Sequence, residues 1–444
     1  MHDFLEICAI TCNRFNHVAL LLLVVIASHF STPVFCDDLT ETSKLTAPDA
    51  AASDLFGESV SISDEYAIVG AVGGDSDLFD GTGAAYIFQR SGGDNWSTPR
   101  KVVAPDGVAN DKFGTSVSVD GNYAIVGSPF DTNTASNSGS AYIFTYPFTD
   151  QPVKLIASDG AARDVFGYSV SISGDYAIVG APTILGVGSG PGAAYIFQRQ
   201  GSAWVEVEIL VPPPGDGAEG DLFGYSVAIS GDHAIVGAPG HGDEGAVYDF
   251  SRTSEGAWEQ NPLGKLVPPG NAVGAQAGWS VAIDGNSAIM GGPTYDGDAG
   301  DNSGAAWVLW REAGTLLVTE RLEAADSAAG DQFGYSVSLS ENHAVVGTLR
   351  YLKGAGAAYV FQTEEDVSFT SDWIQADRLI ASDTSPWWFG TAVALFQNRA
   401  LVGAKGDNVN GPSSGSVYSF NIFAEPDRPL VGLPPGVILL LLEE

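Results

Sequence analysis

Two loops of this chain carry aspartates at a spacing that could bind a divalent cation. Both loops follow the pattern Asp-x-Asp-x-x-Asp, with the carboxylates on Asp75, Asp77 and Asp80 and on Asp296, Asp298 and Asp301. Calcium takes about six to eight oxygen ligands, and a glycine-containing loop with three carboxylates supplies a good share of them. The spacing matches no EF-hand, so two interpretations stay open: a calcium site and a solvated acidic loop. Calcium is the cofactor to test first, because hard oxygen ligands dominate.

An aromatic pair, Trp387-Trp388, directly precedes Phe389. Two neighbouring indole rings in a loop can stack on a sugar or anchor a partner. The alternative is that both rings pack over the last repeat unit, which closes the fold, or over the C-terminal tail. These two residues are the candidate ligand-binding residues of the sequence.

Signals for catalysis are weak. His233 and His343 occupy a position that other copies of a repeat fill with tyrosine, and His241 sits alone in a His-Gly-Asp-Glu loop. A histidine without a positioned nucleophile is poor support for a general base. No nucleophile elbow or His-Glu-x-x-His motif occurs. We therefore name no catalytic residue and expect no enzyme. The alternative, a polysaccharide hydrolase or lyase, needs two carboxylates about 5 to 10 Å apart near the centre of one face.

The element that must position these residues is a repeat. A Phe-Gly pair, with Ala277-Gly278 as its degenerate form, starts seven segments, and a glycine follows each start 14 residues later. The starts are Phe56, Phe113, Phe166, Phe223, Ala277, Phe333 and Phe389. They lie 53 to 57 residues apart, a period typical of propellers and longer than that of most helical solenoids.

One repeat predicts four strands. In the third copy, Lys154 to Ala157 reads as a short strand, and residues 166–173 alternate with Phe166 and Tyr168 on one face. Gly174-Asp175 then predicts a tight turn, residues 176–181 a buried strand and residues 193–199 another. The fold class is all-β, a seven-bladed β-propeller with four antiparallel strands per blade.

The chain order predicts how the ring closes. If Phe-Gly begins the innermost strand, the Lys-Leu-x-Ala strand before it is the outermost strand of the preceding blade. Lys44–Ala47 then completes the seventh blade and removes two open edges. The competing closing strand is Val437 to Leu442.

These residues resemble the FG-GAP repeat, known from the seven-bladed propeller of integrin α-subunits. Phe-Gly occurs with Gly-Ala-Pro in the third copy, at Phe166-Gly167 and Gly180-Ala181-Pro182, and again in the fourth. The resemblance implies binding of adhesion ligands, and in integrins a calcium loop between the first two strands. The 14-residue spacing leaves room only for a tight turn there, so the sequence resembles the version of the repeat without calcium.

Aspartates recur seven and two residues before the Phe in five copies. The pairs are Asp49/Asp54, Asp106/Asp111, Asp159/Asp164, Asp216/Asp221 and Asp326/Asp331. We interpret them as caps of backbone N–H groups in turns. A binding site would more often be found in one copy than in five.

Charge and composition exclude some partners. The 444 residues carry a formal charge of −35, with 54 acidic against 19 basic side chains. Nucleic acid and anionic membrane surfaces are therefore poor partners. The three cysteines all precede the repeats, so no disulfide can lie within the propeller.

Residues 1–36 read as a signal peptide, with an uncleaved N-terminal anchor as the alternative. Residues 37–423 form the propeller, with repeats starting near 44, 101, 154, 209, 265, 321 and 378, and residues 424–444 form a C-terminal tail. Asn95-Trp96-Ser97 is a glycosylation sequon. We expect a secreted or cell-surface monomer that meets the membrane only through that anchor.

The function predicted from the sequence is an extracellular binding or adhesion module whose ligand is a protein or a glycan. A glycan-binding lectin is one alternative, and the polysaccharide-active enzyme is the other. Variation between copies falls largely in seven loops, which we predict to form the binding surface: residues 71–83, 128–139, 181–192, 238–245, 292–304, 348–356 and 404–415.

Overall fold

The computed structural model describes residues 37–73, 81–92, 95–149, 151–183, 190–270, 272–349, 356–363, 372–383 and 387–422. The described residues from Asp38 onward belong to one compact unit. Every regular element in the described ranges is a strand. In those ranges no helix has the length and apolar character to cross a membrane.

The first five blades each consist of four strands that follow one another in the chain and pair antiparallel. Blade 1 is β3 (Phe56–Ile62), β4 (Tyr66–Ala71), β5 (Ala84–Gln89) and β6 (Arg100–Val102). Blade 2 is β7 (Val117–Asp120), β8 (Tyr123–Ser128), β9 (Ser140–Thr145) and β10 (Val153–Leu155). Blade 3 is β11 (Ser169–Ser173), β12 (Tyr176–Ala181), β13 (Ala193–Gln200) and β14 (Ala203–Leu210). Blade 4 is β15 (Ser226–Ser230), β16 (His233–Ala238), β17 (Ala246–Arg252) and β18 (Trp258–Leu266). Blade 5 is β19 (Ser280–Asp284), β20 (Ser287–Gly292), β21 (Ala305–Glu312) and β22 (Thr315–Leu322).

The last two blades each take a strand from the beginning of the propeller. Blade 6 is β23 (Ser336–Ser340), β24 (His343–Thr348), β25 (Ala357–Gln362) and β26 (Ile374–Ile380), with β1 (Asp37–Thr40) as a fifth strand beyond β26. Blade 7 is β27 (Phe389–Phe396), β28 (Arg399–Ala404), β29 (Ser416–Asn421) and β2 (Ser43–Leu45). The predicted seven-bladed β-propeller is confirmed.

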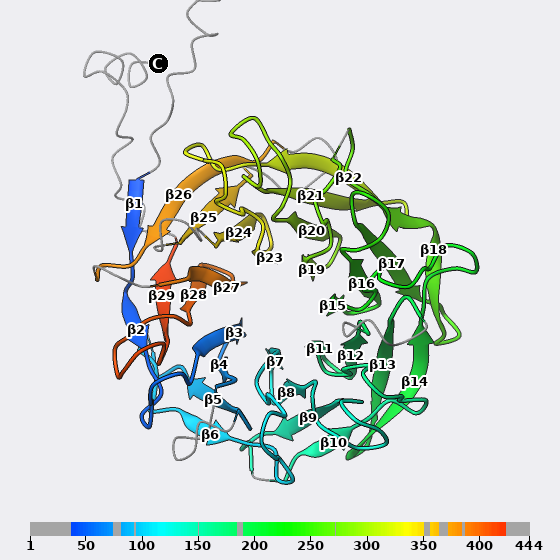
Figure 1. Ribbon diagram of the computed structural model, residues 1–444, viewed down its shortest axis with the longest axis horizontal. Coiled ribbons are helices and arrows are strands. Elements are labelled where there is room, and N and C mark those ends of the chain that lie inside the picture. Colours follow the sequence, from blue (N-terminus) through cyan, green and yellow to red (C-terminus); the bar gives the residue numbers. More distant parts are fainter. Residues whose placement is uncertain are drawn as a thin grey trace, which may run out of the picture. The chain divides into compact units, whose positions relative to one another are not determined.

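Blade 7 confirms how the ring closes. Strand β2 pairs antiparallel with β29, with Lys44 opposite Tyr418 and Leu45 opposite Val417. The prediction that the segment Lys44–Ala47 closes the ring is therefore confirmed. The strand itself spans Ser43–Leu45. The competing segment Val437 to Leu442 lies outside the described residues. Figure 1 shows the first strands of the seven blades around the centre and the fourth strands at the rim.

The predicted tight turn between the first two strands is confirmed. Ser173 pairs with Tyr176, which leaves only Gly174 and Asp175 in the turn. A two-residue hairpin of this kind suits glycine, whose positive φ of 56° at Gly174 costs little. It leaves no room for a carboxylate-rich loop between these strands.

The start of the first strand differs from the prediction. Strand β11 begins at Ser169, and its burial alternates from there, but Phe166 and Tyr168 lie before it in a turn. The N–H of Tyr168 donates to the carbonyl of Val165 in that turn. Gly167, at a φ of 91°, turns the chain between the two rings, so Tyr168 does not share the face of Phe166.

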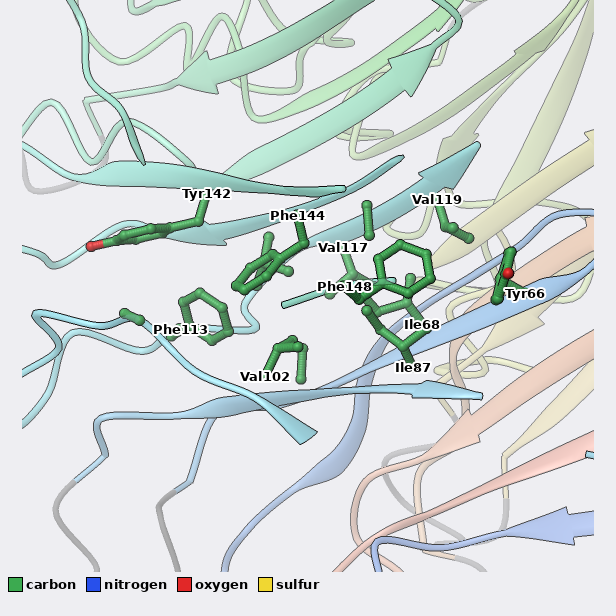
Figure 2. Packing of buried hydrophobic residues seen from close by; sticks show 14 residues of the cluster. Tyr66, Ile68, Ile87, Val102, Phe113, Val117, Val119, Tyr142, Phe144 and Phe148 are labelled. Atoms are coloured by element: carbon green, nitrogen blue, oxygen red, sulfur yellow. The ribbon is translucent and has the colours of Figure 1, made fainter. Parts of the chain in front are cut away.

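The hydrophobic core lies between neighbouring blades. Phe113 packs edge-on against Tyr142 and Phe144 of its own blade, with ring centroids 5.5 and 6.2 Å apart. The same cluster includes Ile68 and Ile87 of blade 1, so two sheets share one core (Figure 2). Fully burying one such aliphatic or aromatic side chain contributes about 1.5–3 kcal/mol.

Glycines allow the blades to approach each other. A Cβ on Gly180 of β12 would overlap the carbonyl oxygen of Gly224 in blade 4. That carbonyl also accepts a hydrogen bond of 2.8 Å from the Ser169 hydroxyl. The recurring Phe-Gly and the glycine 14 residues later are thus the two sides of one blade-to-blade contact.

Candidate functional site

Two sets of loops meet on one face of the propeller. The loop between the second and third strands of each blade ends at a glycine that forms a parallel bridge to the Phe position of the next blade. The bridges join Gly83 to Phe113, Gly139 to Phe166, Gly192 to Phe223, Gly245 to Ala277, Gly304 to Phe333, Gly356 to Phe389 and Gly415 to Phe56. We call this face the axial face. The described parts of the seven variable loops lie on it.

Four aromatic side chains form an arc beside the innermost strands of blades 3 to 6. Tyr168, Tyr225, Trp279 and Tyr335 each lie two residues after the Phe position, and all four are partly exposed. We call this set the axial arc. The ring centroids are 5.0 Å apart for Tyr168 and Tyr225 and 4.8 Å apart for Tyr225 and Trp279. For Trp279 and Tyr335 the centroid distance is 5.6 Å. The tilted contacts are favourable for aromatic pairs and hold the arc together.

The same position in the other three blades carries no ring. It is Glu58 in blade 1, Thr115 in blade 2 and Thr391 in blade 7. Glu58 accepts a hydrogen bond of 3.0 Å from Lys405. The Lys405 ammonium also lies 5.7 Å from the centre of the Trp388 ring, within cation–π range.

The charges of Glu58 and Lys405 affect the tyrosines of the axial arc. Burial raises the pKa of Tyr168, Tyr225 and Tyr335, and the negative charge of Glu58 raises the pKa of each further. Lys405 acts in the opposite direction on the pKa of Tyr335. The hydroxyls therefore stay neutral at physiological pH and can donate or accept hydrogen bonds.

This arrangement can hold a ligand through ring faces and hydroxyls together. Partly exposed aromatic rings supply large contact areas at a low entropy cost, and the tyrosine hydroxyls add direction. The one carboxylate at this position, on Glu58, is ion-paired with Lys405. The arc therefore favours binding over acid–base catalysis.

The two predicted tryptophans have different environments. Trp387 is 54 % exposed, whereas Trp388 is only partly exposed and lies beside Lys405. Trp388 thus contacts blade 7, as the packing alternative expected, and Trp387 offers a free indole ring on the axial face. Their role in binding stays a prediction.

The predicted metal ligands are only partly described. Asp75, Asp77 and Asp80 lie outside the described residues. Asp296, Asp298 and Asp301 are all exposed, and Asp296 accepts a hydrogen bond of 2.7 Å from the N–H of Asn302. Within the described ranges, no three metal-binding side chains lie together as a group. Calcium binding stays a prediction, and a melting temperature unchanged by chelator would contradict it.

The recurring aspartates divide into two roles. The one nearer the Phe caps a backbone N–H three residues earlier, as predicted; Asp164 accepts from Ala161 at 2.7 Å. The other bonds side chains: Asp106 accepts from the Tyr142 hydroxyl at 2.7 Å and from Lys154 at 2.5 Å. The interpretation of these residues as backbone caps is therefore incomplete for the second set, because their carboxylates also bond side chains of the third and fourth strands.

The remaining predicted residues fit structural roles. His233 contacts the Ser251 hydroxyl at 2.9 Å, and burial lowers its pKa. His241 lies 2.9 Å from Asp221. Asn95 is exposed in the loop between β5 and β6, where a glycan could be attached.

The axial arc was missed in the sequence. Its signal was present, because the residue after Phe-Gly is aromatic in four consecutive copies. Reading Tyr168 as a strand residue beside Phe166 assigned it to the core.

A model of the FG-GAP repeat matches the chain seven times. The matched residues are 39–88, 96–144, 149–197, 204–250, 259–309, 318–361 and 373–420. Each match begins in or shortly before the outermost strand of one blade and ends in the third strand of the next. The comparison with curated proteins gave no match.

Proposed function

Because the chain belongs to the FG-GAP repeat family, whose propeller suggests a protein-binding or adhesion-type module, we propose that it is an extracellular binding module with its ligand over the axial arc. The observation that carries this proposal is the run of four partly exposed rings in tilted contact at one repeat position. Rings placed for packing alone would be covered.

The position of the arc supports this proposal. Ligand contacts in repeat architectures use residues that vary between copies on a shared frame. Around the propeller, this position is aromatic in blades 3 to 6. In blades 1, 2 and 7 it is Glu58, Thr115 and Thr391. A ligand over the axis would therefore meet an apolar side and a polar side.

A glycan ligand is the second candidate, and Trp387 favours it. Its exposed indole adds a stacking surface beyond the arc, and sugar rings stack well on aromatic faces. Loss of a glycan signal in Trp387→Ala would support this form of the proposal.

The test is a binding screen of the full propeller against a glycan array and a panel of extracellular matrix proteins. We expect saturable binding to at least one class, unaffected by nuclease treatment. A propeller that binds neither class would contradict the proposal. N-terminal sequencing of the mature protein tests the extracellular location, and the proposal expects a new N-terminus near residue 37 or an anchored chain at the cell surface.

A further inference from the structure

In six blades a basic residue of the outermost strand lies opposite an aromatic residue of the third strand. The pairs are Tyr86 with Lys101, Tyr142 with Lys154, Tyr248 with Lys265, Trp307 with Arg321, Tyr359 with Arg378 and Tyr418 with Lys44. The basic residue is therefore a regular part of the blade.

Blade 2 shows what the cation does. The Lys154 ammonium lies 2.5 Å from Asp106 and 2.8 Å from Asp131, and 5.3 Å from the centre of the Tyr142 ring. Blade 7 repeats this arrangement with Lys44 on the ring of Tyr418. One ammonium group thus neutralises carboxylates beside the tyrosine hydroxyl.

Blade 3 lacks this cation. Tyr195 lies opposite Ile209 where the other blades have lysine or arginine. The Tyr195 hydroxyl still donates to Asp159, at 2.8 Å. Among the described residues no basic side chain forms an ion pair with Asp159 or Asp164, and the residues numbered 184–189 in the adjoining loop carry no charge. Arg163 is exposed and does not line the site.

A pocket of about 460 Å³ opens at this position, lined by Asp159, Asp164, Thr183, Pro191 and Tyr195 among others. Small-ligand pockets span about 300–1,000 Å³. Burial and the charge of Asp159 both raise the pKa of Asp164, and burial likewise raises the pKa of Asp111, the equivalent residue of blade 2. The blade 2 equivalent of Asp159 is Asp106, whose pKa is lowered: burial would raise it, but hydrogen bonds from Lys154 and Tyr142 outweigh burial.

We propose that this third-blade pocket binds a primary alkylammonium group, such as the lysine side chain of a partner protein. Asp159 takes the place of Asp106, Asp164 lines the same pocket, and the Tyr195 ring offers the face that Tyr142 offers to Lys154. Ala181 and Pro191 in the pocket lining supply an apolar surface for the alkyl stem. Calcium needs about six to eight oxygens and no ring face, so it fits this pocket less well. The site is separate from the axial arc and does not depend on it.

The test supplies the missing cation in two ways, as a free lysine probe and as a lysine introduced at position 209. Nα-acetyl-lysine amide and its neutral isostere Nα-acetyl-norleucine amide serve as probes in ligand-observed NMR with the full chain. We expect the lysine probe alone to bind wild type, with binding lost in Ile209→Lys. The control Val205→Lys changes charge equally on the same strand at an exposed position, and it keeps binding. Equal binding to Ile209→Lys, or none to wild type, would overturn the proposal, and so would calcium displacing the probe.

A second readout does not need a probe. Ile209→Lys should raise the melting temperature by more than Val205→Lys does, and Asp159→Asn should cancel the difference. Conversely, Lys154→Ile removes the cation from blade 2 and should add a second binding site for the lysine probe. Unchanged stoichiometry in Lys154→Ile would count against the proposal even if Ile209→Lys did not fold.

Discussion

The Phe position and the position two residues later differ in how much the residue type varies among the seven blades. The first holds Phe in six blades and Ala277 in the other, and every one of these residues is buried. The second, two residues on, is aromatic in blades 3 to 6 and Glu58, Thr115 or Thr391 in the rest. One glycine separates them. The first position forms the core of the blade, whereas the second varies between blades and is partly exposed in six of the seven.

The largest expected loss of stability comes from a substitution at the buried Phe position. Phe166→Ala removes a fully buried ring that packs on Tyr195 and Phe197 and should lower the free energy of unfolding by about 3–5 kcal/mol. Tyr168→Thr, two residues later, should lower it by less than about 2 kcal/mol. Urea denaturation measures both. Equal losses would show that the two positions do not differ in role.

The next effect concerns the contact between blades. Gly180→Ala places a Cβ against the carbonyl of Gly224, and overpacking of this kind costs about 1–3 kcal/mol. Gly190→Ala is the matched control, because its Cβ would meet no atom within 4 Å. A Gly180→Ala variant as stable as Gly190→Ala would contradict the close approach of blades 3 and 4.

A pH effect contrasts blade 7 with blade 3. Burial by itself would raise the pKa of Asp407, but hydrogen bonds from Lys44, Ser416 and Tyr418 outweigh it and hold the pKa below its usual value. A carboxyl with a lowered folded pKa adds stability above its unfolded pKa of about 3.9, and that stability is lost as pH falls through the folded value.

Asp407→Asn should therefore cost about 1–2 kcal/mol at neutral pH and progressively less below pH 4. The pKa of Asp164 is raised by burial first and then by the charge of Asp159, so Asp164→Asn should cost little or stabilise at neutral pH. Denaturation curves across this pH range compare the two variants. A loss for Asp164→Asn as large as the loss for Asp407→Asn at neutral pH would contradict the contrast.

The smallest expected stability effect is at the rim. Leu263 is 69 % exposed, and Leu263→Thr should change the free energy of unfolding by no more than about 0.5 kcal/mol. A thermal melt checks this, and a larger loss would disqualify the variant as a control for binding.

Much of the fold follows from the sequence because the repeat is local and recurs. The Phe-Gly spacing gives seven blades, and counting unpaired strands at both ends identifies Lys44–Ala47 as the closing segment. Strand β1 of blade 6 was not predicted, since nothing in Asp37–Thr40 alternates and its pairing with β26 joins distant parts of the chain.

The candidate sites were harder to predict, because they depend on comparing copies and not on motifs. Trp279 follows the degenerate copy Ala277-Gly278, and its neighbours Tyr225 and Tyr335 lie more than 50 residues away in sequence. Ile209 is an ordinary strand residue until it is set against Lys154 and Lys265. The candidate binding residues lie where the copies differ, and equivalent positions become comparable only once the backbone of the blades is aligned.

The most direct test of the axial arc as a ligand site replaces its aromatic residues with the threonine that other blades carry at the same position. The triple variant Tyr225→Thr, Trp279→Thr, Tyr335→Thr installs the residue that blades 2 and 7 carry at this position, so the fold should be retained. Affinity for the ligand found by screening is measured by surface plasmon resonance beside Leu263→Thr. We predict a loss of at least about tenfold in the triple variant and none in the control. A folded triple variant that binds as tightly as wild type would contradict the account.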